Sequence, residues 1–235
     1  SAGGDNLVLR ARDVLRRHLV SRGRPAPGVA IHLEKNLPVA SGIGGGSADA
    51  AAALRGLLRL WHAGVDERTL AAIALTLGAD VPMCLLSRPL IARGIGEDIT
   101  PLPDMPVFPM VLANPMTPVS TPAVFGALAE RTNPPVGAVP QAAGAAAAWI
   151  AALGDMRNDL EPPARTLCPA IGDVADALSR SGAALVRMSG SGATCFALYA
   201  THADAASAAE TIARQEPGWF VAATRTRGGS THGTP

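Results

Sequence analysis

The chain has 235 residues, of which 48% are hydrophobic and 17% charged, and its formal net charge is +1. This length favours one large or two modest globular domains that fold without disulfides. The near-zero charge gives no electrostatic reason to expect nucleic acid or a membrane surface as a partner.

The first hundred residues are predicted to be mainly helical. Helices are predicted over residues 5–20, 47–61 and 66–77, and a half-buried strand over 28–35. On the first helix, the spacing of apolar residues favours a face made by Leu7, Ala11, Val14 and His18. Residues 89–103 then predict two short strands joined by a glycine turn.

A series of prolines between residues 101 and 109 indicates a boundary between a domain of residues 1–105 and a second domain of residues 106–227. The second domain begins with a buried strand over 107–115. Helices follow over 121–131, 139–153 and 169–181, then a strand–turn–strand over 184–200, a helix over 203–215 and a strand over 219–224. This order is typical of an α+β, ferredoxin-like domain. Residues 228–235 are predicted to be a disordered tail.

The three cysteines, Cys84, Cys168 and Cys195, stand far apart and outside any metal-site spacing. They are interpreted as small buried hydrophobic residues of a reduced, cytoplasmic protein, and no residue is predicted to be a structural metal ligand. The longest alanine-rich stretch is too short to span a bilayer.

The stretch "PVASGIGGGSAD", residues 38–49, places four glycines within five positions, between the predicted strand and a helix. Glycines let backbone N–H groups at a helix start approach an anion closely, which favours a phosphate site. The loop lacks the lysine of a Walker sequence, and Ser47 stands where the dinucleotide fingerprint needs glycine. A tight strand–helix connection without a ligand is the alternative.

Three further stretches allow both a structural and a functional interpretation. Asp80 precedes the apolar "VPMCLL", where it fits a helix cap or a general base for a substrate hydroxyl. "SGSGAT" (189–194) fits a hairpin turn or a second wall of a phosphate site. "TPVST" (117–121) by itself indicates only a helix start.

Taken together, the stretches resemble the GHMP kinase superfamily. The matching pieces, in order, are "DNLVLRA", "KNLPVASGIGGGSADAAAAL", "LGADVP", "GIGE", "NPMTPVSTPAVF", "NDLE" and "MSGSGATCF". "LGADVP" with "GIGE" and "VST…F" is similar to the branch that phosphorylates the 2-hydroxyl of a cytidine-diphosphate-linked methylerythritol in non-mevalonate isoprenoid synthesis. The fold implied is a ribosomal protein S5 domain 2-like N-terminal domain followed by a ferredoxin-like C-terminal domain.

The resemblance implies ATP and Mg²⁺ as cofactors, a small-molecule substrate, and a monomer or homodimer. Asp80 matches the catalytic aspartate. Thr121 and Phe125 match the substrate side, with Phe125 stacking on cytosine. The positions implied to bind the nucleotide are Asn6, Lys35, Pro38, Gly42, Ile43, Gly44, Gly45, Gly46, Ser47, Ala48, Gly190 and Gly192.

The chain departs from the family in two places. Ala48 stands where a second serine is common. Family members also carry about sixty further residues before "DNL", including strands of the first sheet, so that sheet is expected to be incomplete with an exposed edge. Two alternatives therefore stand beside the kinase: a nucleotide-binding remnant without turnover, and another small-molecule kinase of the superfamily.

Overall fold

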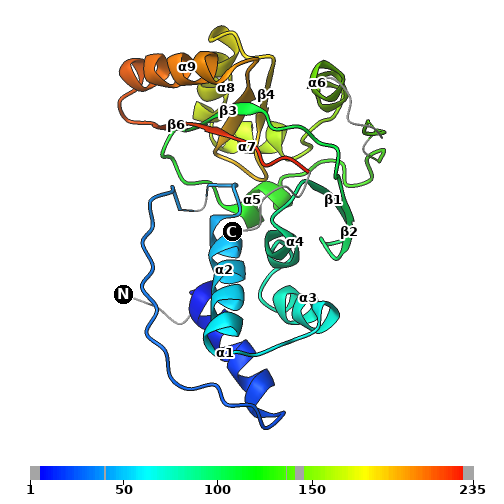
Figure 1. The fold of residues 1–235 in the computed structure, drawn as a ribbon. Coiled ribbons are helices and arrows are strands. Elements are labelled where there is room, and N and C mark those ends of the chain that lie inside the picture. The colour runs from blue at the N-terminus through cyan, green and yellow to red at the C-terminus, as the bar shows by residue number, and fades with distance from the viewer. Residues whose placement is uncertain (1–5, 40, 136, 141–145, 230–235) are drawn as a thin grey trace. The chain divides into compact units, whose positions relative to one another are not determined.

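The computed structural model describes residues 6–39, 41–135, 137–140 and 146–229. The chain divides into two compact units (Figure 1). One consists of Ser1–Asn36 and Gly44–Leu102, and the other of Leu37–Ile43 and Pro103–Pro235. The glycine-rich loop therefore passes from one unit to the other between Ile43 and Gly44. The boundaries placed from sequence after residues 105 and 227 stay predictions.

The first unit consists of helices and one hairpin in its described part. Its elements are α1 (Leu7–Val20), α2 (Gly45–Leu60), α3 (Glu67–Leu75), α4 (Val81–Leu86), β1 (Leu90–Arg93) and β2 (Asp98–Pro101). The two strands pair antiparallel, as the sequence predicted for residues 89–103. Helices α1 and α4 both pack against α2, and their common core includes Leu15, Leu54 and Val81.

The buried face of α1 differs from the predicted one. Its buried residues are Val8, Ala11, Leu15 and Leu19. These positions also repeat at three- and four-residue intervals, so the spacing allowed two overlapping faces. The more apolar face, with two leucines, is the one buried, while the His18 ring lies 3.1 Å from the Arg22 guanidinium through its Nδ1.

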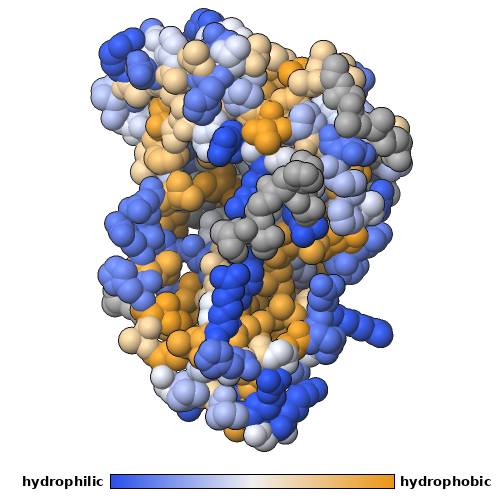
Figure 2. Space-filling view, viewed as in Figure 1, coloured by the Kyte–Doolittle hydropathy of each residue, from blue (hydrophilic) through white to orange (hydrophobic). Residues whose placement is uncertain are grey.

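The strand predicted over residues 28–35 is wrong, because the structure has irregular backbone there. A strand needs a neighbour for its backbone hydrogen bonds, and the described strands of this unit, β1 and β2, pair with each other. Ile31 is consequently 37% exposed. Apolar surface is also visible on the face shown in Figure 2.

The second unit contains a four-stranded antiparallel sheet in the order β4-β5-β3-β6. Its strands are β3 (Pro109–Asn114), β4 (Leu185–Met188), β5 (Cys195–Leu198) and β6 (Phe220–Arg225). The central strand β3 pairs through Val111 with Ala197 on one side and with Ala223 on the other. Helices α8 (Ala170–Arg180) and α9 (His202–Gln215) pack on the sheet and share one core with it. The strand order and the helices confirm the predicted ferredoxin-like domain and the α+β class.

Between β3 and α8 the structure describes three shorter helices, α5 (Thr121–Gly126), α6 (Ala146–Gly154) and α7 (Glu161–Leu167). Helix α5 is shorter than predicted, and part of the helix predicted over 139–153 lies outside the described residues. Helix α7 was not predicted, and it contains Pro162 and Pro163, a residue type that usually interrupts a helix. Both prolines fall in its first turn, where a missing N–H loses no helical hydrogen bond.

The predicted disordered tail falls mostly outside the described residues. Of residues 228–235, the structure describes 228 and 229, and the Gly229 amide donates to the Met105 carbonyl (2.9 Å). Within the described chain, no helix combines the length and the apolar character needed to cross a bilayer.

Candidate functional site

The glycine-rich loop ends in an open helix N-terminus. Gly44 is the N-cap of α2 in the left-handed conformation (φ 69°), and Gly45, Gly46 and Ser47 form the first turn. N–H groups at a helix start have no acceptor within the helix, and here no side chain caps them. The first turn also lacks an acidic residue, so the positive end of the helix dipole is not neutralised locally.

The space beside Gly45 gives these donors room for a ligand. A Cβ atom built on Gly45 would meet nothing within 4 Å, so internal packing does not account for the glycine. A side chain there would, however, stand beside the uncapped N–H groups. The arrangement fits an anion such as a nucleotide phosphate. Ser47, in the same turn, adds a hydroxyl oxygen.

The preceding residues of the loop are held by the second glycine turn, "SGSGAT". The Ser189 hydroxyl donates to the Gly42 carbonyl (3.0 Å), and the Thr194 amide donates to the Ser41 carbonyl (3.2 Å). We call these two hydrogen bonds the loop clasp. The structure thus brings together the two glycine stretches that the sequence separates by about 150 positions.

Both turns of the clasp need glycine for steric reasons. Gly42 has φ 75°, and a Cβ there would overlap the Ser189 carbonyl and lie 2.7 Å from the Gly192 carbonyl oxygen. Gly190 has φ 52°, and its Cβ would lie 2.7 Å from the Gly42 carbonyl oxygen. Left-handed backbone favours glycine at both positions, and the backbone contacts exclude even a methyl group.

Polar side chains form hydrogen bonds with the side chains of the SGSGAT turn. The Asn114 amide donates to the Thr194 hydroxyl (2.8 Å), and both residues are almost fully buried. The Asn114 side-chain oxygen accepts from the Met116 amide (2.8 Å). The Ser191 and Thr121 hydroxyls lie 2.8 Å apart. Because each buried polar group has a partner, the turn keeps one defined conformation.

Asp80 occupies the N-cap position of α4 but does not cap the helix. Its side chain makes no capping hydrogen bond, and the residue is exposed. Pro82 lies in the first turn of the helix. The carboxylate raises the pKa of the Cys84 thiol further, beyond the larger effect of burial. An N-cap aspartate that forgoes the usual bond keeps both carboxylate oxygens for another partner.

The "GIGE" turn packs against the residue before Asp80. Gly96 has φ 115°, and a Cβ there would lie 2.6 Å from the Ala79 carbonyl oxygen. The turn is closed by the Glu97 carboxylate, which accepts from the Ile95 amide (2.6 Å). Two of the motifs quoted from the sequence, "LGADVP" and "GIGE", therefore meet at the backbone beside Asp80.

Asn6 and Lys35, predicted to bind the nucleotide, both have protein partners in the first unit. The Asn6 side chain accepts from the Val8 amide (2.9 Å) and so caps α1. The Lys35 ammonium lies 2.9 Å from the Asp49 carboxylate on α2, in a pair exposed to solvent. Ala48, also on α2, is exposed.

The predicted substrate residues lie on α5 in the second unit. Thr121 is its first residue, and Phe125 is 50% exposed although it is a large aromatic side chain. The Phe125 carbonyl accepts from Arg131 (3.5 Å). Pro38 and Ile43, predicted to bind the nucleotide, also belong to this unit and are half-buried.

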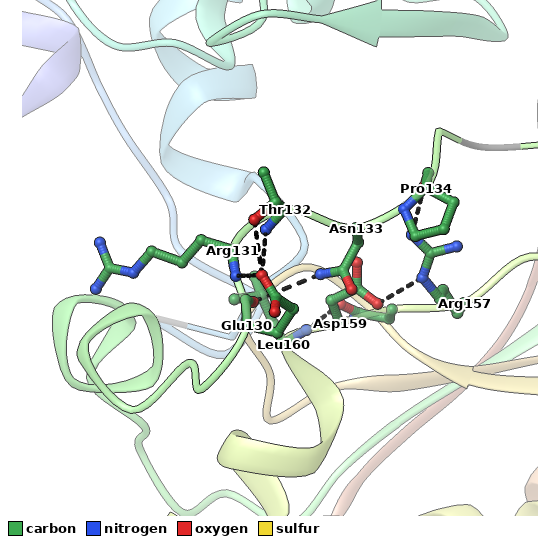
Figure 3. Close-up of polar contacts among 9 residues, drawn as sticks. Glu130, Arg131, Thr132, Asn133, Pro134, Arg157, Asp159 and Leu160 are labelled. Carbon is green, nitrogen blue, oxygen red and sulfur yellow. Dashed lines mark hydrogen bonds and ion pairs between the residues drawn. The ribbon is translucent and has the colours of Figure 1, made fainter.

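No role was predicted for Asn158, although it belongs to the "NDLE" motif. The Asn158 amide donates to the carbonyls of Met188 (2.9 Å) and Gly190 (2.8 Å). Figure 3 shows the neighbouring Arg157 paired with Asp159 (2.7 Å) and donating to the Pro134 carbonyl. The signal in the sequence was the polar "NDLE" stretch, which sequence alone does not distinguish from an ordinary turn or helix start.

Among the described residues, no group of three or more histidine, cysteine, aspartate or glutamate side chains is placed to hold a metal ion. Two of the cysteines, Cys168 and Cys195, are buried as predicted, whereas Cys84 is half-buried. Burial raises the pKa of the Cys195 thiol to about 12.

Comparisons with known proteins agree over both units. Two family models match: the GHMP kinases N terminal domain over residues 6–88, and the GHMP kinases C terminal over residues 139–217. The 4-diphosphocytidyl-2-C-methyl-D-erythritol kinase of Sinorhizobium medicae (strain WSM419) is 64% identical over 96% of this chain and 74% of its own length. That of Agrobacterium fabrum (strain C58 / ATCC 33970) is 59% identical over 96% of this chain and 76% of its own.

Solved structures show the same relationship. A crystal structure of 4-(cytidine 5'-diphospho)-2C-methyl-D-erythritol kinase has a TM-score of 0.78 at 37% identity, covering 97% of this chain and 80% of that one. Homoserine kinase from Cytophaga hutchinsonii ATCC 33406 has a TM-score of 0.72 at 21% identity, covering 95% and 76%. The second likeness concerns the fold alone.

Proposed function

The chain belongs to the GHMP kinase family, and within it to the 4-diphosphocytidyl-2-C-methyl-D-erythritol kinases, and on that premise we propose the reaction that it catalyses. It transfers the γ-phosphoryl group of ATP to the 2-hydroxyl of 4-(cytidine 5'-diphospho)-2-C-methyl-D-erythritol, a step of non-mevalonate isoprenoid synthesis. The observation that carries the proposal is the uncapped start of α2, with open space at Gly45.

In this proposal the backbone holds the nucleotide. The N–H groups of Gly44, Gly45, Gly46 and Ser47 bind phosphate oxygens, and the loop clasp at Gly42 fixes the loop that presents them. Phosphoryl transfer depends mainly on positioning and on stabilisation of charge, so a rigid backbone cradle is suited to it. The remaining residues assigned to the nucleotide, with the roles proposed from the resemblance, are Asn6, Lys35, Pro38, Ile43, Ala48, Gly190 and Gly192.

ATP is accompanied by Mg²⁺ in this proposal. The ion neutralises charge on the phosphates and needs only one or two protein oxygens, because phosphates and water complete its shell. The Ser47 hydroxyl is the protein oxygen that we assign to it. The scarcity of clustered carboxylates in the described chain is compatible with a metal that arrives with the nucleotide.

Asp80 receives or orients the proton of the attacking 2-hydroxyl. The support is its free carboxylate at the start of α4, with the capping bond absent. On the substrate side, the exposed ring of Phe125 stacks on the cytosine and Thr121 lines the same place on α5. Aromatic rings left half in solvent serve such stacking without a large loss of core packing.

A coupled assay of ADP release tests the proposal. The purified chain is mixed with ATP, Mg²⁺ and the cytidine substrate, and Asp80→Asn is expected to lower kcat by about 10²–10⁴ if the carboxylate acts as the base. Asp176→Asn, at an exposed position of α8, is the matched control. An Asp80→Asn variant with near-normal turnover would show that the base assignment is wrong.

The same assay separates the alternatives. Turnover with homoserine but not with the cytidine substrate would indicate another kinase of the family. Binding of a non-hydrolysable ATP analogue in calorimetry, with no turnover of any acceptor, would indicate a nucleotide-binding protein instead.

A further inference from the structure

The segment of residues 157–161 contacts the SGSGAT turn at its start. Both hydrogens of the Asn158 amide are used, one on the Met188 carbonyl (2.9 Å) and one on the Gly190 carbonyl (2.8 Å). The Glu161 carboxylate accepts from the Met188 amide (3.3 Å). Met188 is therefore held by both its N–H and its C=O, where β4 ends and the turn begins.

These contacts reach the part of the turn that touches the glycine-rich loop. Gly190 lies against the Gly42 carbonyl, with too little space for a Cβ between them. The residue between the two held carbonyls is Ser189, whose hydroxyl forms one bond of the loop clasp. Asn158 thus holds the carbonyls of the two residues that flank the clasp donor, and a shift of either residue would move that hydroxyl.

Asn158 is itself held in place by its neighbours. Its side-chain oxygen accepts from the Leu160 amide (3.0 Å), which closes a local turn before α7. Glu161 pairs with Arg165 one turn later (2.6 Å). On the other side, Arg157 pairs with Asp159 and bonds to the Pro134 carbonyl, as Figure 3 shows. A side chain with all its polar atoms engaged is well suited to fix the position of another segment.

We propose that Asn158 is a positioning residue for nucleotide binding, which acts by holding the SGSGAT turn in the conformation that clasps Gly42. The inference rests on the proposed function, since it assumes that the loop holds nucleotide phosphates. In this proposal Asn158 acts through the turn and not on the reacting atoms. Removal of the Asn158 amide is expected to leave the uncapped start of α2 intact but to free the loop before it from the SGSGAT turn.

The test compares two isosteric substitutions. Asn158→Asp keeps the oxygen that accepts from Leu160 but places a carboxylate against two carbonyls, whereas Asn133→Asp introduces the same charge at an exposed asparagine that bonds to the Glu130 carbonyl. Calorimetry with a non-hydrolysable ATP analogue and with the cytidine substrate measures the two affinities separately. Asn158→Asp is expected to weaken analogue binding at least tenfold and to leave cytidine substrate binding within twofold. Asn133→Asp is expected to change neither.

Hydrogen exchange and a second variant complete the experiment. Amides of residues 189–194 are expected to exchange faster in Asn158→Asp than in the unsubstituted chain. If Asn158→Asp does not fold, Asn158→Ser serves, because its short hydroxyl cannot reach both carbonyls; the same tenfold loss is expected.

An analogue affinity within twofold of normal in the folded variant, whatever its melting temperature, would overturn the inference. A chain that binds the analogue but does not phosphorylate the cytidine substrate would overturn the proposed acceptor alone.

Discussion

Two glycine-to-alanine substitutions in the same loop are expected to act in opposite directions on stability. Gly42→Ala forces a side chain into left-handed backbone and into contact with the Ser189 and Gly192 backbone. The conformational strain is about 1–2 kcal/mol, and the two clasp hydrogen bonds contribute about 0.5–1.5 kcal/mol each. The free energy of unfolding should therefore fall by about 2–5 kcal/mol if the loop separates from the turn.

Gly45→Ala is compared with Gly42→Ala because it is expected to separate an effect on stability from an effect on ATP binding. The position has ordinary helical backbone and open space. Alanine should therefore raise the free energy of unfolding by about 0.4–1 kcal/mol, because it lowers the conformational entropy of the unfolded chain. Its methyl group nevertheless occupies the space assigned to the phosphates, and the KM for ATP should rise about tenfold or more, equivalent to about 1.4 kcal/mol.

Urea unfolding and the coupled kinase assay measure both quantities on the same preparations. A Gly45→Ala variant that is more stable but has an unchanged KM for ATP would refute the assignment of the α2 start as the phosphate cradle. A Gly42→Ala variant with normal stability would refute the loop clasp.

Three further predictions concern other parts of the chain. Gly96→Ala should lower kcat and the melting temperature together, because its Cβ would press on the Ala79 carbonyl beside Asp80, whereas Ile95→Ala at the same exposed turn should change neither. Phe125→Ala should raise the KM for the cytidine substrate about three- to tenfold, from a stacking energy of about 0.5–1.5 kcal/mol, with the KM for ATP unchanged in the same assay. The Cys195 thiol has its pKa raised to about 12 by burial, so above the thiol's usual pKa the unfolded chain loses this proton first and stability falls as pH rises. Urea unfolding between pH 9 and 11 should show that the free energy of unfolding falls less steeply with pH for Cys195→Ala than for the parent chain. The two slopes should differ by about 1.4 kcal/mol per pH unit at most, and equal slopes would contradict this prediction.

Local patterns predicted the elements that local physics determines. The hairpin of residues 89–103 and the helix that follows the glycines are present because turn residues and apolar spacing act within a few positions. The prediction of a strand over 28–35 was wrong for the opposite reason. Alternating apolar residues show which side chains a strand would bury, but a strand also needs a partner strand from elsewhere in the chain. In the described residues that partner is absent.

The site was predictable in its parts but not in its connections. Glycine density predicted a phosphate loop and, separately, the SGSGAT turn, and glycines in both segments have positive φ angles. The clasp between Gly42 and Ser189 was not predictable from the residues themselves, because no local pattern encodes a hydrogen bond between segments so far apart. Asn158 and Asn114 were missed for the same reason: an asparagine that braces distant carbonyls has the same sequence signature as one that begins a turn.

The clasp also has a consequence for the order of events on the ribosome. Gly42 and Ser189 are 147 positions apart, and synthesis at about 5–20 residues per second separates their appearance by roughly 7–30 s. Helix α2 can form soon after it emerges, but the loop before it has to remain without its partner until the β4–β5 hairpin has been made. A nascent chain released before residue 189 would carry the start of α2 without the turn whose hydrogen bonds hold the loop that leads into it.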